Sequence, residues 1–317
     1  MPSMYDNKIT SAEPTLMVFL IDQSASMSEP LAEKEGELYT IAKVSKIIAD
    51  TFLYDAFRRC MRGNVFKPYI DLAVIGYGVG IHSALPKIPL EQFPFSVTKL
   101  ADAYIAKNAS NPDVVPLIPR PKLEWLEERA DSGVTPMLAA FTKAREIIEK
   151  WLPDHQTSFP PIVINISDGA PNDDPVFNQM CQEAAEQGIP RLGDLSQTGL
   201  VIQSKAIQDM GTDNGKCLVL NAHVSARGHK DIQYPSSIDE AENIDALAKF
   251  MFEMSSTIPD SLHDYGTKTM KLKLEPNARF FIFNADITSL LTFMQFGTSQ
   301  ANLGDDGGSN TSSLPAP

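Results

Sequence analysis

The sequence has few of the features that mark several common classes of protein. Only three of its 317 residues are cysteines, and Cys60, Cys181 and Cys217 are too far apart to form a metal-binding or redox motif. We therefore expect free, buried thiols and a cytoplasmic location, because disulfides are rare in that compartment. No uninterrupted apolar stretch approaches the length that spans a membrane, so we expect no membrane partner.

Positive charge is also scarce. The chain has 27 lysine and arginine residues against 40 aspartate and glutamate residues, a formal net charge of −13. Binding to nucleic acid without sequence preference requires clustered basic side chains that neutralise phosphates, so we expect no nucleic-acid partner. Residues 1–14 lack the basic, apolar and cleavage-site segments of a signal peptide, which favours the same cytoplasmic location.

The chain does contain apolar, strand-like segments that alternate with amphipathic, helix-like segments. The expected strands are residues 16–21, 69–78, 161–167, 217–224 and 279–283, and the expected helices are residues 37–61, 136–152, 239–254 and 286–296. This alternation predicts a doubly wound α/β fold, in which helices cover both faces of a mostly parallel central sheet. Ligands of such sheets bind beyond the carboxyl ends of the strands.

We expect a single domain over residues 15–300. An N-terminal extension (residues 1–14) precedes it, and a tail rich in Gly, Ser, Asp and Pro (residues 301–317) follows and is expected to be disordered. The domain contains two long insertions, at about residues 82–131 and 173–215. Long insertions in a compact domain are usually functional or partly structured.

Each insertion shows some local periodicity. In the first, which is rich in proline, helical spacing occurs only near residues 97–106, and residues 122–130 are compatible with a short charged helix or an edge strand. In the second, helix-like segments lie near residues 177–186 and 196–210. Both insertions are placed where they could flank a site at the strand ends.

Oxygen-bearing side chains occur where two expected strands end and where one expected helix begins. Asp22 ends the first strand, and Ser24 and Ser26 follow it at alternating positions. Thr135 precedes a helix, and Asp168 follows a later buried strand. Carboxylates and hydroxyls are hard donors of the kind that Mg²⁺ prefers. The pattern therefore predicts a magnesium site, which Mn²⁺ could also fill in vitro.

Three segments together resemble a known motif. The segment Asp22-x-Ser24-x-Ser26, a later Thr-Pro pair and a Ser-Asp-Gly segment resemble, in order and spacing, the metal-ion-dependent adhesion site of a von Willebrand factor A domain. The resemblance covers roughly residues 15–300. It is greatest to stand-alone cytoplasmic bacterial members of the family, which implies a role in signalling, stress or defence.

The resemblance also implies roles for the five site residues. Ser24, Ser26 and, in one state, Thr135 would bind the cation directly, whereas Asp22 and Asp168 would act largely through water. One coordination position would stay open for an acidic side chain of another protein. The implied function is therefore a non-catalytic adaptor that docks its partner through a metal-bridged carboxylate.

Other interpretations of the same residues exist. Each aspartate could cap a loop, the two serines could be turn residues, and Thr135 could simply begin a helix. A strand-end aspartate followed by later acids also resembles a haloacid-dehalogenase-type phosphatase, in which Asp22 would attack a phosphoryl group. That family requires a second aspartate where this chain has Ser24, so we expect no enzymatic activity. His223, at the end of an expected strand, is the one histidine placed to reach the rim of the site.

Overall fold

The computed structural model describes most of the chain. The described residues are 4–5, 8–34, 36–62, 65–104, 125–131, 133–169, 171–188, 193–224, 231–237, 246–284, 289–290, 292–293 and 296. The predicted disordered tail, residues 301–317, lies outside them.

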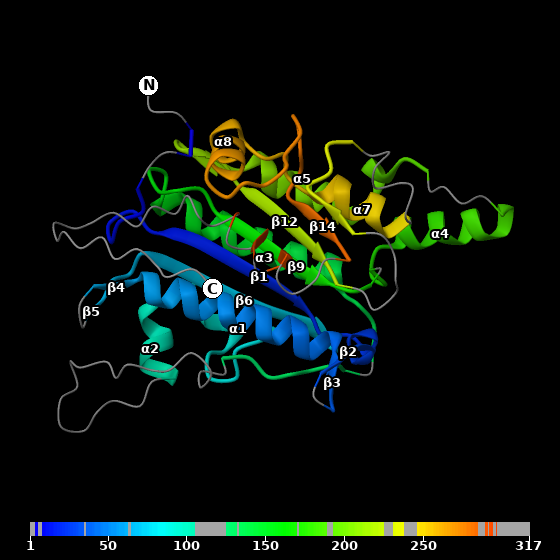
Figure 1. Ribbon diagram of the computed structural model, residues 1–317, viewed down its shortest axis with the longest axis horizontal. Helices are drawn as coiled ribbons and strands as arrows, with labels where there is room; N and C mark the ends of the chain where they lie inside the picture. The colour runs from blue at the N-terminus through cyan, green and yellow to red at the C-terminus, as the bar shows by residue number, and fades with distance from the viewer. Residues whose placement is uncertain are drawn as a thin grey trace.

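A central sheet organises the molecule (Figure 1). Five neighbouring strands of this sheet are parallel: β1 (Thr15–Asp22), β6 (Ile70–Gly78), β9 (Ile162–Ser167), β12 (Leu218–His223) and β14 (Phe281–Phe283). Three short antiparallel strands border them: β7 (Gly80–Ser83) and β8 (Phe95–Ser96) beside β6, and β13 (Ile232–Gln233) beside β14. Every residue of β1 and of β9 is buried, as expected for parallel strands covered on both faces.

The spatial order of the strands is that of a doubly wound fold. The order β7-β6-β1-β9-β12-β14 corresponds to 3-2-1-4-5-6 in chain order. The chain places β6 and then β7 on one side of β1. It then places β9, β12 and β14 in succession on the other side of β1. The order therefore reverses between β1 and β9, which is where ligands of such sheets bind. The predicted doubly wound α/β fold is confirmed.

Helices flank the sheet. Helix α1 (Ile41–Arg59) packs on β1, and the rings of Phe19 and Phe52 lie 5.1 Å apart. Helix α5 (Gly199–Asp209) packs against both α3 (Met137–Trp151) and α7 (Ala246–Met254), away from α1 (Figure 1). Within the described residues, no helix has both the length and the apolar character needed to cross a membrane.

The other elements are short or peripheral. They are η1 (Ala25–Ser28), β2 (Pro30–Lys34), β3 (Glu37–Thr40), β4 (Met61–Arg62), β5 (Val65–Phe66), η2 (Leu90–Gln92), α2 (Thr98–Tyr104), η4 (Leu152–Asp154), α4 (Pro175–Gln187), η5 (Leu195–Gln197), β10 (Gly211–Thr212), β11 (Gly215–Lys216) and α8 (Asp260–Lys268). Helices α2, α4 and α5 confirm the helical segments predicted within the two insertions.

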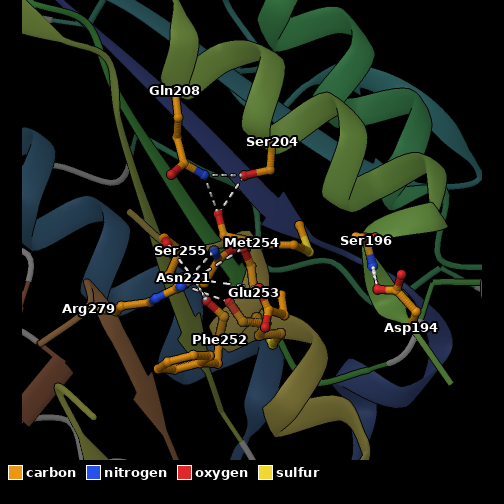
Figure 2. A network of polar contacts seen from close by, with 11 residues as sticks. Asp194, Ser196, Ser204, Gln208, Asn221, Phe252, Glu253, Met254, Ser255 and Arg279 are labelled. Carbon is orange, nitrogen blue, oxygen red and sulfur yellow. Dashed lines mark hydrogen bonds and ion pairs between the residues drawn. The ribbon is translucent and has the colours of Figure 1, made fainter. Parts of the chain in front are cut away.

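A polar network fixes the C-terminal end of α7 (Figure 2). The carbonyl oxygen of Met254 accepts hydrogen bonds from the Ser204 hydroxyl and from Gln208 Nε2, the latter at 2.9 Å. Arg279 Nη1 donates to the carbonyl oxygen of Phe252 at 3.0 Å. These contacts satisfy carbonyl groups that a helix leaves without a partner at its C-terminus. The guanidinium charge is also favourable there.

The predicted start of the helix expected at residues 37–61 was wrong. Helix α1 begins at Ile41, and the hydroxyl of Thr40 caps it by accepting a hydrogen bond from the backbone N–H of Lys43 at 3.1 Å. Strand β3, which the prediction had included in the helix, pairs instead with β2 in an antiparallel hairpin. The helix does not extend N-terminally past Thr40 because the backbone of this capping residue is extended.

Other predictions were incomplete. Residues 125–130 form neither a helix nor a strand, and the backbone N–H groups of Trp125 and Leu126 each donate to Asp50 Oδ1 at 3.0 Å. Residues 122–124 lie outside the described residues, as do residues 239–245 of the predicted helix 239–254, whose described part contains α7. The closing helix predicted at 286–296 is described only in part, and α8 was not predicted.

Candidate metal centre

Asp22 lies at the carboxyl end of β1, with 1% of its surface exposed. Its Oδ1 accepts a hydrogen bond from the backbone N–H of Ser24 at 2.9 Å. Its Oδ2 accepts one from the hydroxyl of Ser167 at 2.7 Å. Because Ser167 is the last residue of β9, this carboxylate joins the ends of the two strands between which the strand order reverses.

The two serines after Asp22 face the same space. The hydroxyl oxygens of Ser24 and Ser26 are 3.1 Å apart. The hydroxyl of Ser26 also donates to Asp168 Oδ1 at 2.9 Å. The turn η1, in which the backbone N–H of Met27 donates to the carbonyl of Ser24, holds the serines in this arrangement. The loops after β1 and β9 are therefore joined by side-chain oxygens.

Thr135 approaches the same space from the start of α3. A Cβ atom added to Gly169 would lie 3.6 Å from the hydroxyl oxygen of Ser26 and 3.9 Å from that of Thr135. Two hydrogen bonds with Asn172 fix the position of Thr135. The backbone N–H of Thr135 donates to Asn172 Oδ1 at 2.6 Å, and the backbone N–H of Asn172 donates to the carbonyl oxygen of Thr135 at 3.1 Å. The structure thus brings together all five residues predicted for the site.

Residues that the sequence analysis did not single out support this arrangement. Ser167 and Asn172 position Asp22 and Thr135, as described above. Asp173 accepts hydrogen bonds from the first N–H groups of α3, at Leu138 and Ala139. The run Asn172-Asp173-Asp174 was visible in the sequence as a cluster of capping residue types, but the helices that it caps were not apparent from that cluster alone.

The loop between Asp22 and Ser24 rests directly on β6. The backbone N–H of Gln23 donates to the carbonyl of Tyr77 at 2.7 Å, and its carbonyl accepts from the N–H of Asp131 at the same distance. The side chain of Gln23 is buried, and its Oε1 lies 2.5 Å from His82 Nε2. Gly78 allows this approach, since a Cβ there would lie 2.6 Å from the carbonyl oxygen of Gln23.

His223 lies on the strand next to the site. It is the last residue of β12, is paired in register with Ser167, and is 3% exposed. Its ring stacks on that of Phe283, with centroids 4.2 Å apart. Its position beside Ser167 agrees with the prediction, but its ring packs in the core against β14.

Burial makes the two carboxylates difficult to ionise together. Burial, and next the nearby charge of Asp22, raises the pKa of Asp168 to about 7. Burial also raises the pKa of Asp22, against the lowering effect of its hydrogen bonds with Ser24 and Ser167. Among the ion pairs found in the described part of the chain, none involves either aspartate. A bound cation would supply the positive charge that favours their ionised forms.

The oxygen spacing fits a small divalent cation. In an octahedral Mg²⁺ site with bonds of roughly 2.0–2.1 Å, adjacent ligand oxygens are about 2.9 Å apart. The Ser24–Ser26 and Ser26–Asp168 oxygen separations, 3.1 and 2.9 Å, are close to this value. Within the described residues, no three His, Cys, Asp or Glu side chains form a metal-binding group. This donor set differs from such groups because three of its five side chains carry hydroxyls.

Comparisons with known proteins give likenesses in structure only. No protein-family model matches the chain, and no curated protein matches it in sequence. The vWF domain of the type V pili tip protein Mfa5 from Porphyromonas gingivalis is 13% identical, with a TM-score of 0.46 over 94% of this chain and 98% of that one. The PilB minor pilin from Streptococcus sanguinis is also 13% identical, with a TM-score of 0.44 over 94% and 64%.

A third structure is the manganese-loaded TRAP protein of Plasmodium vivax. It is 14% identical, with a TM-score of 0.37 over 89% of this chain and 72% of that one. The chain spans 64% of the pilin structure and only 20% of a longer Mfa5 structure with three N-terminal domains. At these identities and TM-scores, the likenesses carry no argument about family or function.

Proposed function

We propose that this chain is a von Willebrand factor A-type interaction domain that binds Mg²⁺, or Mn²⁺ in vitro, at a metal-ion-dependent adhesion site. The residues that would hold the cation are Asp22, Ser24, Ser26, Thr135 and Asp168. The observation that carries this proposal is the linked set of oxygens Ser24–Ser26–Asp168, at 3.1 and 2.9 Å, at the point where the strand order reverses. When bound, the cation would attract an acidic side chain of a partner protein.

The arrangement around Asp22 favours binding over catalysis. A nucleophilic aspartate needs an accessible oxygen, but Asp22 is 1% exposed and both of its carboxylate oxygens already accept hydrogen bonds. We therefore propose a non-catalytic role. Release of phosphate from an aryl phosphate by the wild type, and its loss in Asp22→Asn, would favour the phosphatase alternative instead.

The proposed setting is the cytoplasm of a bacterium, in a signalling, stress or defence system. The cysteines support a reducing compartment, since Cys60 and Cys217 are buried free thiols and Cys181 is a partly buried one. This part of the proposal otherwise rests on the resemblance of the three sequence segments to cytoplasmic members of the family.

Titration calorimetry with MgCl₂ tests the cation site. We expect the wild type to bind one Mg²⁺ and Ser26→Ala to bind it at least about tenfold more weakly, because a hydroxyl that joins both loops is lost. Ser28→Ala is the matched control: its hydroxyl lies in the same turn but donates only to the carbonyl of Ala25. Equal affinities for all three proteins would contradict the proposed ligand set.

Partner docking requires a second experiment. Affinity capture from the native host, with Mg²⁺ and with chelator, should recover a partner only in the presence of the metal. The double variant Ser24→Ala, Ser26→Ala should lose that partner, and Ser28→Ala should keep it. Equal recovery by the wild type and the double variant would show that docking uses another face of the molecule.

A further inference from the structure

Two exposed valines lie on two segments that meet at the rim of the candidate metal centre. Val79 is 62% exposed and Val134 is 56% exposed, whereas most large apolar side chains of the described residues are buried. A Cβ atom added to Gly133 would lie 3.3 Å from Cγ2 of Val79, so the chain that leads into Val134 passes directly against Val79. The two exposed side chains are therefore carried by segments that touch each other.

The backbone places these segments beside the site. Val134 directly precedes Thr135, whose hydroxyl faces the same space as that of Ser26. Val79 follows Gly78, which contacts the loop that joins Asp22 to Ser24. Isolated exposed valines are ordinary on protein surfaces. Val79 and Val134 differ from isolated valines because the segments that carry them meet beside a candidate binding centre.

We propose that Val79 and Val134 form an apolar subsite that binds the side chain two positions from the acidic residue of the partner. The partner segment is extended and carries an aspartate or glutamate for the cation and an aliphatic residue for the valines. In an extended segment, side chains two positions apart face the same side, roughly 6–7 Å from each other. This inference rests on the proposed function, because it requires a cation that binds the acid.

The surface offers complementary chemistry to such a segment. The cation matches the carboxylate, and the valines match an aliphatic side chain whose burial adds affinity in proportion to the apolar area covered. A second copy of the chain is a poorer occupant, since each copy has a formal net charge of −13 and the two would repel each other. A short extended segment of a different protein avoids that repulsion.

Nuclear magnetic resonance titration with two synthetic peptides tests the subsite. The peptides are acetyl-Leu-Ser-Asp-Ser-Leu-amide, which presents leucine in either chain direction, and acetyl-Ser-Ser-Asp-Ser-Ser-amide. With saturating MgCl₂ we expect the leucine peptide to bind the full chain about five- to tenfold more tightly than the serine peptide. Val79→Ser and Val134→Ser should each reduce this ratio to about two or less, with Mg²⁺ affinity unchanged.

Val65→Ser is the matched control. Val65 is 59% exposed and lies on β5, at the opposite end of the molecule from β2 and β3 (Figure 1). This variant should keep the full preference for the leucine peptide. Equal binding of both peptides by the wild type would overturn the subsite while leaving carboxylate docking intact. Binding of Mg²⁺ without binding of either peptide would overturn carboxylate docking and the subsite together. Self-association of the wild type that is lost in the Val79→Ser variant would assign the surface to a second copy of the chain instead.

Discussion

Single hydrogen bonds, more than the sheet itself, fix the oxygens of the candidate metal centre. Asp22 is held at both carboxylate oxygens, and Ser26 joins the loop after β1 to Asp168 after β9. The side chains of Asp22 and Ser24 can both face the site because the residue between them, Gln23, is anchored to β6. The positions of these side chains therefore depend on the close approach of the loop to that strand.

Gly78→Ala tests this approach. The added methyl group would lie 2.6 Å from the carbonyl oxygen of Gln23 and 2.9 Å from its carbonyl carbon, and these backbone atoms have little room to move. We expect a loss of about 1–3 kcal/mol in the free energy of unfolding, measured with urea, together with weaker Mg²⁺ binding. In the control Gly193→Ala, the added methyl group meets nothing within 4 Å, so both quantities should stay near those of the wild type. Unchanged Mg²⁺ affinity in Gly78→Ala would show that the loop does not need this contact.

Asp71, which lies away from the candidate metal centre, should make the stability of the protein depend on pH. Its Oδ2 accepts a hydrogen bond from the indole N–H of Trp151 at 2.8 Å, and burial raises its pKa. A raised pKa in the folded state means that its contribution to stability is complete below the ordinary aspartate pKa and is lost as the pH rises through the folded-state pKa. The stability of the wild type relative to Asp71→Asn should therefore fall as the pH rises from about 4 towards neutrality.

Asp264→Asn provides a control of opposite sign. Asp264 is exposed and paired with Lys268, which lowers its pKa. Its contribution is present above the ordinary aspartate pKa and is lost as the pH falls through the folded-state value. Urea denaturation of wild type and Asp71→Asn from about pH 4 towards neutrality, and of wild type and Asp264→Asn below about pH 4, measures the two slopes. A stability difference between wild type and Asp71→Asn that does not vary with pH would contradict the assignment.

At this scale, the five proposed site residues could be chosen from the sequence, whereas the residues that position them could not. Oxygen-bearing side chains at the expected strand ends and at the helix start were visible without a structure. The bond from Ser167 to Asp22 spans 145 residues, and that from Thr135 to Asn172 spans 37. Such contacts follow from strand register and loop conformation, which a single sequence does not specify.

Among the helices and strands, one carboxylate links the two helices of the second insertion. Asp174 Oδ1 accepts from the backbone N–H of Phe177 at 3.1 Å, in the first turn of α4, and Oδ2 accepts from that of Leu200 at 2.9 Å, in the first turn of α5. Asp174 is fully buried. It follows the site loop directly, so the starts of both helices are tied to the loop that carries Asp168.

Replacement of Asp174 by alanine should loosen both helix starts. We expect a loss of about 1–3 kcal/mol in the free energy of unfolding, because two buried N–H groups lose their acceptor. Hydrogen exchange should accelerate in the first turns of both α4 and α5. In the control Asp194→Ala, an exposed carboxylate that accepts from the N–H of Ser196 is removed (Figure 2). Its effect on the free energy of unfolding should be much smaller than that of Asp174→Ala. Acceleration in α4 alone would contradict the shared cap.

The elements that were predicted best are the buried, strongly periodic ones. Strands β1, β6, β9 and β12 match their expected ranges to within one residue at each end, since continuous apolar runs are typical of parallel strands. Strand β3 was missed because its apolar Leu38 continues the helical spacing of α1, yet this side chain is 53% exposed. Its extended conformation depends on pairing with β2, which local periodicity does not reveal.

For the whole molecule, topology and charge together give the candidate site its character. The reversal of strand order between β1 and β9 places the ends of both strands at one edge. There Asp22 is buried and Asp168 half-buried, and neither forms an ion pair among the described residues. With a formal net charge of −13, the chain as a whole would repel an acidic partner. A divalent cation at this edge would provide a local attraction for one carboxylate.

Anomalous diffraction from crystals soaked in MnCl₂ tests the central claim most directly. The account predicts a manganese peak bordered by the side-chain oxygens of Ser24, Ser26 and Asp168, with metal–oxygen distances of roughly 2.0–2.4 Å for direct ligands. The peak should disappear in crystals of Ser26→Ala and persist in crystals of Ser28→Ala. A manganese peak elsewhere, with none between the loops after β1 and β9, would contradict the account.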